Sequence, residues 1–367
     1  MKRLLLAGAG HAHLDVIRNL ATKPWPGVEV TLICPYPRQI YSGMIPGWIA
    51  GQYTLDQCAA PLAALVEKAG IRWVQDSVCG LDAANSVADC QSAGEIPYDV
   101  ISIDTGARVE SSAFSNSTAP LLPIRPLEQF ASGWKAIEAA LIASGTARLA
   151  IIGGGAAGVE LALAVDYALR QHLTSAQVSV VLVSRGVLLG GHAPGVVKRV
   201  DKLLKSRGIA LYSGRASGHD DGLILDSGEL IACDCIIAAT GVAPPAWLAT
   251  SGLALCEHGF IAAGDGQQST SHNNVFAAGD VSSRIDFPHA KSGVYAVRAG
   301  PVLTVNLQRA LNKQEPTSYQ PQKRSLYLLA TGPREAVLSW GTFSAGGAWA
   351  WMLKDWIDRR FMRQYQT

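Results

Sequence analysis

Two stretches of the chain share one order of apolar runs, glycine turns and helical periodicity. Near the start, the apolar run Arg3–Ala7 is followed by a glycine turn, a helical pattern that ends near Leu20 and a second apolar run at Val28–Ile33. The same order returns about half a chain later, from Arg148–Ile152 to Val178–Val183. Continuous apolar runs are typical of parallel strands that helices cover on both faces. We therefore predict an α/β fold in which one βαβ unit occurs twice, which favours two dinucleotide sites over one.

Segments rich in proline and small polar residues divide the chain further. Two of them, Glu110–Pro126 and Val242–Trp247, indicate surface crossings into and out of the second βαβ unit. A third, Asn312–Arg324, is typical of a linker. The predicted fold is therefore two Rossmann-like dinucleotide-binding domains plus a small C-terminal α/β unit. The first domain would be discontinuous, and the expected bounds are 1–118 and 245–312 for the first domain, 119–244 for the second and 313–367 for the C-terminal unit.

Composition places the chain among globular proteins. Of its 367 residues, 49% are hydrophobic and 16% are charged, so it suits two domains and is too apolar to be disordered. A net charge of +2 gives no electrostatic reason to expect a nucleic-acid partner. Seven scattered cysteines, an odd number, favour a reducing, cytoplasmic setting. The apolar run Leu4–Ala9 is too short for a signal peptide, and no stretch approaches the roughly 20 apolar residues that span a bilayer.

The first glycine turn has most of the features of a dinucleotide-binding loop. Gly8 and Gly10 are the first two glycines of G-x-G-x-x-G, and they allow a tight turn whose backbone N–H groups can approach a diphosphate. His13 replaces the third glycine, which mainly permits close packing of helix on strand. The pair His11 and His13 could suggest a metal, but no nearby Cys or acid completes a site, so we expect packing or cofactor contacts from them.

The second glycine turn is complete. It follows a predicted strand and opens a predicted helix, which is the context that a diphosphate-binding loop requires. Its candidate binding residues are Gly153, Gly155, Ala156, Ala157 and Gly158. The motif therefore predicts nucleotide binding more strongly here than in the first unit.

The acid that usually binds the ribose is missing from both units. The first following strand ends in Cys34 and Pro35, and the second ends in Ser184 and Arg185. In the second unit, an arginine in place of the acid suits the 2′-phosphate of NADPH. An exposed loop arginine is the alternative interpretation, so NADPH and NADH both stay open.

Three further segments carry a family resemblance. Tyr98–Gly106 and Cys233–Gly241 both end in Thr-Gly and resemble the strand-turns that close the FAD and NAD(P) halves of flavoprotein oxidoreductases. Asn274–Asp280 resembles the strand-Gly-Asp motif whose aspartate holds the ribityl chain of FAD. Together with the two glycine turns, these motifs stand in the order found in the FAD/NAD(P)-dependent pyridine nucleotide-disulfide oxidoreductase superfamily.

Within that superfamily the chain resembles type II NADH dehydrogenases, and in particular the subgroup associated with selenide, water dikinase. The residues behind this narrower likeness are Tyr41–Gly47, Lys291–Arg298, Ala330–Arg334 and Lys354–Arg360. The resemblance covers nearly the whole chain. His13 and the missing acid near Cys34 depart from the family pattern in the region expected to bind the adenosine of FAD.

The resemblance implies an FAD-dependent oxidoreductase that takes hydride from NADPH or NADH and passes electrons to a quinone-like or other small acceptor. There are two alternatives: a reductase of a protein electron carrier, and a non-catalytic flavin-fold module that serves selenium metabolism. The residues expected to hold FAD are Gly8, Gly10, His11, Ala12, Pro35, Arg38, Met44, Pro46, Thr105, Gly106, Gly279 and Asp280. Those expected to hold the nicotinamide nucleotide are Gly153, Gly155, Ala156, Ala157, Gly158, Ser184, Arg185, Thr240 and Gly241.

Two residues are candidates for a direct catalytic role. Lys291 lies in Pro288–Leu303, a predicted helix whose N-terminus would stabilise negative charge on the reduced flavin, and its ammonium would add to that effect. Glu160 lies one turn into the second predicted helix, where related enzymes place it near the nicotinamide. A solvated lysine and an ordinary acid at a helix N-terminus are the alternative interpretations.

The cysteines do not form a redox pair of the superfamily's spacing. Cys233 and Cys235 are the nearest approach, and on one strand their positions suit buried thiols better than a disulfide. Disulfide reduction is therefore disfavoured. Sulfide oxidation is disfavoured as well. The catalytic cysteines of that reaction should flank the flavin, and no cysteine follows Cys256.

The segment Gly347–Arg363 has the pattern of an amphipathic helix. Its apolar positions, on one side, are Met352, Leu353, Trp356, Ile357 and Phe361; the opposite side carries Lys354, Asp355, Asp358 and Arg359. Such a helix can pack on the flavin domain, form the seam of a homodimer or lie in a membrane interface. The expected setting is therefore cytoplasmic, with peripheral contact to the inner membrane face as one of the alternatives.

Overall fold

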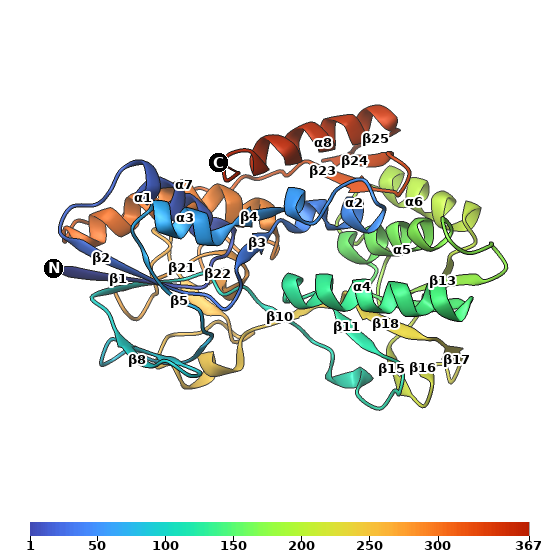
Figure 1. Cartoon of the computed structure of the whole chain (residues 1–367), viewed down its shortest axis with the longest axis horizontal. Coiled ribbons are helices and arrows are strands. Elements are labelled where there is room, and N and C mark those ends of the chain that lie inside the picture. The colour runs from blue at the N-terminus through green and yellow to red at the C-terminus, as the bar shows by residue number, and fades with distance from the viewer. Residues whose placement is uncertain (367) are drawn as a thin grey trace.

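In the computed structural model, which describes residues 1–366, the chain is organised around two parallel sheets (Figure 1). The first sheet has the strand order β21-β9-β1-β2-β5. Its strands, all parallel, are β1 (Lys2–Ala7), β2 (Val28–Ile33), β5 (Arg72–Val74), β9 (Val100–Ile103) and β21 (Val275–Ala277). The last of these returns from far along the chain to pair with β9. Four residues of β1, from Leu4 to Ala7, are almost completely buried, as a strand covered on both faces requires.

The second sheet repeats this arrangement with the order β11-β18-β12-β13-β14. Its strands are β11 (Leu121–Pro123), β12 (Ala147–Ile152), β13 (Val178–Ser184), β14 (Ala210–Ser213) and β18 (Cys235–Ala238), and they too are all parallel. The predicted α/β fold with two Rossmann-like cores is confirmed. The domain bounds expected near residues 118, 244 and 312 stay a prediction.

Helices cover the two sheets. Those of the first are α1 (His11–Thr22), α3 (Leu62–Lys68) and α7 (Gly293–Leu311); those around the second are α4 (Leu127–Ser144), α5 (Ala156–Leu169) and α6 (Pro194–Ser206). Helices α1 and α7 pack closely at Gly300, where a Cβ atom would stand 2.9 Å from the Cβ of Asp15. Helix α7 begins later than the predicted Pro288 because the residues before Ser292 form an irregular loop, and it runs further, to Leu311.

Each parallel sheet carries a small antiparallel one. These are β6 (Val78–Asp82), β7 (Val87–Cys90) and β8 (Gly94–Pro97) in the first half, and β15 (Ala216–His219), β16 (Gly222–Leu225) and β17 (Leu230–Ala232) in the second. The two crossings between the halves run side by side, because β10 (Arg108–Val109) pairs antiparallel with β19 (Val242–Ala243). The short pairs β3 (Arg38–Ile40) with β4 (Ala59–Pro61), and β20 (Ile261–Ala263) with β22 (Ser282–Arg284), complete the first half together with α2 (Ile45–Ile49).

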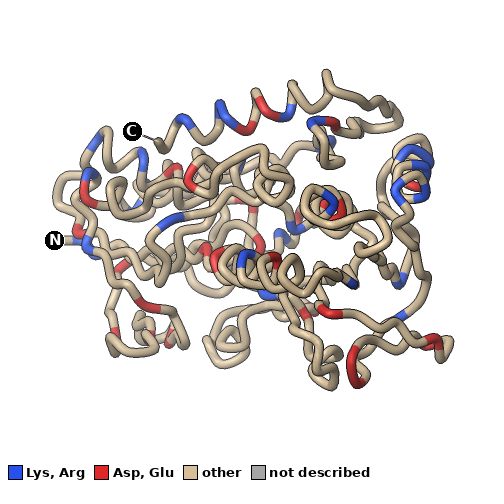
Figure 2. The backbone as a smooth tube through the Cα atoms, turned by 45° about the vertical axis from the view of Figure 1, so that its right-hand side comes forward, with Lys and Arg blue, Asp and Glu red and all other residues tan. Residues whose placement is uncertain are grey.

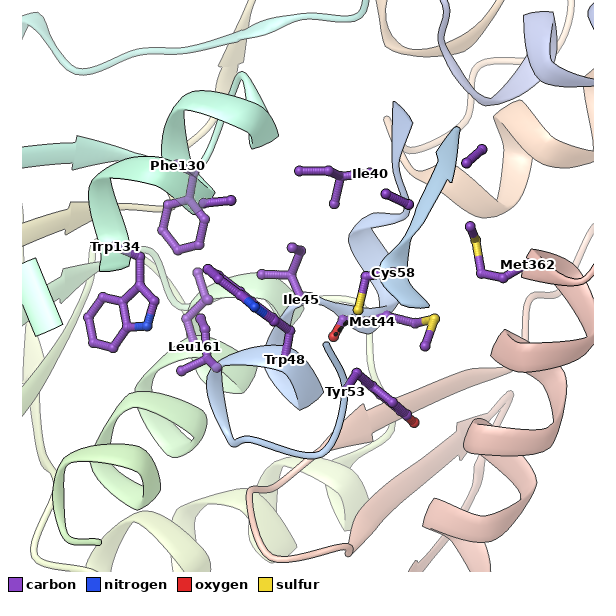
Figure 3. Close-up of a cluster of buried hydrophobic side chains, with 14 of the residues drawn as sticks. Ile40, Met44, Ile45, Trp48, Tyr53, Cys58, Phe130, Trp134, Leu161 and Met362 are labelled. Carbon is purple, nitrogen blue, oxygen red and sulfur yellow. Dashed lines mark hydrogen bonds between the residues drawn. The ribbon is translucent and has the colours of Figure 1, made fainter. Parts of the chain in front are cut away.

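The C-terminal unit lies across both halves (Figure 1). It consists of the antiparallel strands β23 (Tyr327–Ala330), β24 (Ala336–Trp340) and β25 (Phe343–Gly347), followed by α8 (Ala348–Met362). A shared core holds the three units together, as Figure 3 shows for Met44, Trp48, Leu161 and Met362. Within residues 1–366, no helix combines the length and the hydropathy that a membrane span needs.

The prediction for the two sides of α8 is wrong. The residues that α8 buries are Ala350, Lys354, Asp358 and Met362, whereas Met352 and Trp356 are 65% and 52% exposed. The reason is that Lys354 and Asp358 neutralise each other and find polar partners beneath the helix, so two charged residues can occupy the packed face.

Candidate functional site

The first glycine turn lies where β1, β9 and α1 meet. Gly8 has φ +85°, and a Cβ atom there would stand 2.5 Å from the backbone oxygen of Asp104, just beyond the end of β9. Gly10 precedes the first residue of α1, and its N–H donates to the same oxygen at 3.1 Å. The backbone of the turn is therefore pressed against the end of β9, which only glycine permits at position 8.

The carboxylate of Asp104 occupies the N-terminus of α1. Its Oδ2 accepts hydrogen bonds from the N–H groups of Ala12 at 2.9 Å and of His13 at 3.1 Å. Asp104 is 3% exposed, and burial raises its pKa to about 7, although the two N–H groups oppose the shift. Nearby Asp280 raises the pKa slightly further. The family resemblance of Tyr98–Gly106 depends on its closing Thr-Gly, so the sequence motif does not single out Asp104.

His13, which stands in place of the third glycine, fills the space between α1 and the sheet with its ring. Its ring is fully buried between helix and sheet, where Nδ1 lies 2.6 Å from the Gly8 oxygen and Nε2 lies 2.7 Å from Ser102 Oγ on β9. Burial lowers its pKa to about 4, so the ring is neutral at physiological pH. The predicted packing role of His13 agrees with these contacts.

Asp280 lies beside the first glycine turn, at the start of a short turn of helix, Gly279–Val281. Its carboxylate pairs with the guanidinium of Arg125. The His11 Nε2 near this ion pair is buried and has no hydrogen-bond partner among residues 1–366. A buried imidazole nitrogen without a partner is costly, and a bound ligand is one way to satisfy it. These residues fit the flavin dinucleotide that the sequence motifs predict.

Lys291 is partly buried and has partners within the chain. Its Nζ donates to the backbone oxygen of Ser282 and lies 3.8 Å from the centre of the Phe260 ring. Burial lowers the pKa of Lys291 to about 8, and Asp280 opposes that shift. A cavity of about 20 Å³, large enough for a single water molecule, is lined by Asp280, Lys291 and Tyr295 among others. The catalytic role predicted for Lys291 stays a prediction.

The second glycine turn presents an open helix end. A Cβ atom on Gly153 would collide with the oxygen of Ala239, and one on Gly158 would collide with the oxygen of Gly153. Gly155, directly before α5, faces open space, and no side chain caps the helix. The free N–H groups of Ala156 and Ala157 at this end suit a diphosphate. The chain thus fits a dinucleotide at the second turn.

The residues expected around the second nucleotide lie at the carboxyl edge of its sheet. Ser184 is buried and its Oγ donates to the Gly186 oxygen at 2.8 Å, while Arg185 is exposed. Thr240 Oγ1 donates to the Glu110 oxygen at 2.6 Å, and Gly241 faces open space. Arg185 is therefore free to reach a nucleotide at this edge, where ligands of such sheets bind.

Several residues expected to contact FAD have other partners. Arg38 forms an ion pair with Glu128 of α4 at 2.8 Å. Met44 is fully buried and belongs to the core that Figure 3 shows around Trp48, and Pro46 is buried in α2. Further candidates for FAD contact, Pro35 and Thr105, are exposed, and Gly106 has φ +72° with open space beside it.

A group of buried charges lies where the three units meet. Glu160 of α5 accepts the N–H of Ala330 at 2.8 Å, and Lys354 of α8 donates to the Gly43 oxygen at 2.6 Å and to Asp358 at 2.8 Å. Desolvation raises the pKa of Glu160 to about 7, although Lys354 opposes it. Burial alone would lower the pKa of Lys354, but Asp358 and Glu160 raise it above its usual value. The sequence singled out Glu160 and placed Lys354 and Asp358 only on the polar side of the predicted helix; their i, i+4 spacing was the available signal for an ion pair.

Polar contacts fasten the C-terminal unit beside this group. Gln52 donates to the Gly332 oxygen and accepts from the Trp351 indole at 2.9 Å. Tyr53 donates to Asp355 at 2.8 Å. Away from it, Cys233 and Cys235 are buried and unpaired, in agreement with their predicted state.

Comparison with known proteins agrees with this geometry. Residues 2–300 match the family model described as pyridine nucleotide-disulphide oxidoreductase. The chain is 27% identical over 299 residues, 77% of its length, to a probable ferredoxin reductase, CtmF, of Castellaniella defragrans, and covers 68% of that protein. It is 28% identical over 205 residues, 51% of its length, to ferroptosis suppressor protein 1 of Xenopus tropicalis, of which it covers 52%.

The fold has close neighbours among solved structures. The sulfide:quinone oxidoreductase of Aquifex aeolicus superposes with a TM-score of 0.81 at 18% identity, covering 100% of this chain and 92% of that one. Several curated relatives are about twice as long as the segment they share with this chain. The family match over most of the chain, the doubled Rossmann-like core and the two glycine turns lead to one conclusion. The chain belongs to the pyridine nucleotide-disulphide oxidoreductase family, whose members are oxidoreductases that use FAD and a nicotinamide nucleotide.

Proposed function

We propose that the protein is an FAD-dependent NAD(P)H dehydrogenase that passes electrons to a quinone-like acceptor. The observation that carries this proposal is the pair of glycine turns, each at the carboxyl edge of its own parallel sheet and each at a helix N-terminus. Two such turns allow two dinucleotides to be held by one chain. The flavin, when bound, accepts hydride from the nicotinamide and returns electrons to an acceptor.

The residues of this chain supply binding and orientation. Gly8, Gly10 and His11 would hold FAD at the first turn, with Asp280 on its ribityl chain. The open N-terminus of α5 at Gly155–Gly158 would hold the diphosphate of the nicotinamide nucleotide. Exposed Arg185 supports NADPH over NADH, because its guanidinium can pair with a 2′-phosphate.

The buried charges supply proton handling. Reduction of a quinone consumes protons as well as electrons, so a nearby group must hold a proton at neutral pH. The Glu160 carboxyl, with a pKa of about 7, exchanges a proton in that range. Lys354 holds a proton on Nζ. It belongs to the same group of charges, since the carboxylates of Asp358 and Glu160 both raise its pKa. We infer that Glu160 and Lys354 serve the acceptor's protonation.

A quinone acceptor also accounts for the exposed aromatic surface of the C-terminal unit. Five of its large apolar side chains are between 50% and 65% exposed, and we call this set the aromatic face: Trp340 and Phe343 on β24 and β25, and Trp349, Met352 and Trp356 on α8. Exposed Arg360 lies near the end of α8 and exposed Arg363 directly after it, and Figure 2 shows both basic and acidic positions along this helix. Tryptophan beside arginine suits the headgroup region of an anionic membrane, where lipid-soluble quinones reside. We infer that this face rests on lipid.

A second candidate acceptor is a protein electron carrier. The 27% identity to a probable ferredoxin reductase favours it, and it requires the same two cofactors. The association with selenide, water dikinase that the sequence resemblance implies stays a prediction, and so does the non-catalytic module. Both leave the binding roles of the glycine turns unchanged.

Anaerobic stopped-flow spectroscopy tests the proposal. The purified flavoprotein is mixed with NADPH or NADH, and then with a lipid quinone in vesicles, a soluble quinone or an oxidised ferredoxin. We expect rapid bleaching of the flavin band, faster with NADPH, and reoxidation by quinone. Reoxidation by ferredoxin alone would select the second candidate. A bound flavin that neither nucleotide bleaches would identify a non-catalytic module, and a chain that cannot be loaded with flavin would refute the proposal.

A further inference from the structure

The strand end that lies against each glycine turn carries a different residue in the two halves: Asp104 at the first turn and Ala239 at the second. The backbone oxygen of Asp104 stands against Gly8, and the backbone oxygen of Ala239 stands against Gly153 in the same way. The residues that follow, Thr-Gly, are identical in both halves. At the second turn the alanine leaves the N-terminus of α5 without a side-chain cap. At the first turn the aspartate extends its carboxylate over the N-terminus of α1.

This carboxylate fills the position at which a helix N-terminus binds an anion. Its Oδ2 accepts from the N–H groups of Ala12 and His13, and Cβ atoms added to Gly10 or Gly279 would meet its side chain. A diphosphate bound at the N-terminus of α1 would require the same N–H groups. One set of donors thus faces two anionic groups, one of them a residue of the chain itself.

The charged groups around Asp104 do not compensate it. On α1, His11 and His13 both have pKa values lowered to about 4 by burial, so both are neutral between pH 6 and pH 8. Beside Gly279, Asp280 adds a like charge, and the cation that approaches from the loop before α4, Arg125, is paired with Asp280. A carboxylate and a diphosphate would therefore repel each other here in a site of low polarity.

We propose that the Asp104 carboxylate competes with the diphosphate of FAD for the N–H groups of Ala12 and His13, so that FAD binding takes up one proton at this carboxyl. The protonated carboxyl loses its negative charge and can donate its O–H to a phosphate oxygen. This inference rests on the proposed function, because it takes FAD as the ligand of the first turn.

The direction of the pH dependence follows from linkage. The pKa of Asp104 is about 7 without the diphosphate, and an adjacent diphosphate raises it further. A group whose pKa rises on binding makes its full favourable contribution to binding when the pH is below its unbound pKa. That contribution is lost as the pH rises from the unbound pKa to the bound pKa. The dissociation constant of FAD should therefore be about tenfold larger at pH 8 than at pH 6, the limit being tenfold per pH unit.

Isothermal titration of the full-length chain, freed of flavin, with FAD tests the inference. Titrations at pH 6 and pH 8, in buffers of different protonation enthalpy, measure both the dissociation constant and the protons taken up. We expect weaker binding at pH 8, an uptake that approaches one proton per FAD at pH 8, and an uptake close to zero at pH 6, where the carboxyl is already protonated. Asp104→Ala, which makes the first turn like the second, and Asp104→Asn should bind FAD with a pH-independent constant that matches or improves on the wild-type value at pH 8.

Asp99→Asn is the matched control, because Asp99 is an exposed acid on the same segment that pairs with Arg3. It should keep the wild-type pH dependence. If the Asp104 variants fail to fold, the proton uptake of the wild-type chain still decides. FAD binding without proton uptake and with a constant that ignores pH would overturn the inference alone, as would a large loss of affinity in folded Asp104→Asn. Absence of FAD binding at both pH values would refute the proposed function instead.

Discussion

Lys354 and Asp358 lie one turn apart on α8 and form an ion pair, with Nζ and Oδ2 separated by 2.8 Å, on the face that the helix buries. The side chains are 8% and 5% exposed. Lys354 also donates to the Gly43 oxygen, so the pair ties the C-terminal unit to the loop before α2. A pair buried this deeply is costly when broken, because the remaining charge has no water around it.

Lys354→Met should therefore destabilise the protein. The substitution leaves Asp358 buried without its partner, and we expect the free energy of unfolding to fall by about 3–5 kcal/mol. Urea denaturation at neutral pH measures the change. Lys205→Met is the control, since Lys205 and Asp201 form an i, i+4 pair with side chains 75% and 37% exposed, and it should cost less than about 1 kcal/mol. Equal losses of unfolding free energy in the two variants would show that the buried ion pair contributes no more to stability than the exposed one.

Glu160→Gln should flatten the pH dependence of turnover. The wild-type carboxyl has a pKa of about 7, so its protonated fraction falls between pH 6 and pH 8, and acceptor reduction should slow over that range. Glutamine keeps an oxygen for the Ala330 N–H but holds no transferable proton, so turnover should be several-fold lower at pH 6 and nearly constant with pH.

The same substitution should affect stability in a defined direction. A carboxyl whose pKa is raised on folding contributes fully below its unfolded pKa, and that contribution is lost as the pH rises through about 7. Thermal melting should thus show Glu160→Gln to be stabilised relative to wild type at pH 8 more than at pH 5. A wild-type turnover profile that Glu160→Gln leaves unaltered would exclude a proton-handling role.

Gly158→Ala should weaken the nicotinamide nucleotide without affecting the flavin. A Cβ atom there collides with the Gly153 oxygen and displaces the N-terminal turn of α5. We expect flavin content to be unchanged and the nucleotide concentration for half-maximal bleaching to rise at least about tenfold, because diphosphate binding depends on these N–H groups. Gly190→Ala, whose added Cβ meets nothing closer than 3.5 Å, should behave as wild type. Loss of flavin with intact nucleotide binding would reverse the assignment of the two turns.

The aromatic face should govern binding to lipid vesicles. Replacing Trp349 and Trp356 with serine removes two exposed indoles from α8, and co-sedimentation with anionic vesicles should fall to background. Val187→Ser with Leu230→Ser is the control, because these exposed apolar residues lie on the second half of the chain, and it should leave sedimentation unchanged. If the tryptophan variant sediments with vesicles as the wild type does, the membrane role of the aromatic face is rejected. If the wild type is a dimer and the variant is a monomer, the aromatic face instead binds a second copy of the chain.

The sequence alone determined the two βαβ units. The runs at β1, β2, β12 and β13 are mostly apolar, and the glycine turns follow two of them directly, so local patterning places each strand to within one or two residues. Positive φ at Gly8 and Gly153 likewise reflects a requirement local to each turn. Parallel order and shared carboxyl edges then place the candidate binding loops without further information.

Only the tertiary structure decided which side chains meet. Lys354 and Asp358 face inward because they neutralise each other there and Lys354 donates to the backbone oxygen of Gly43, a residue some 300 positions earlier. Arg38 is paired by Glu128, and the carboxylate of Asp104 reaches donors more than 90 residues away. The periodicity of a segment indicates how much apolar surface it must bury. The energy of a buried charge depends instead on partners that distant segments bring, and a local sequence pattern does not reveal those partners.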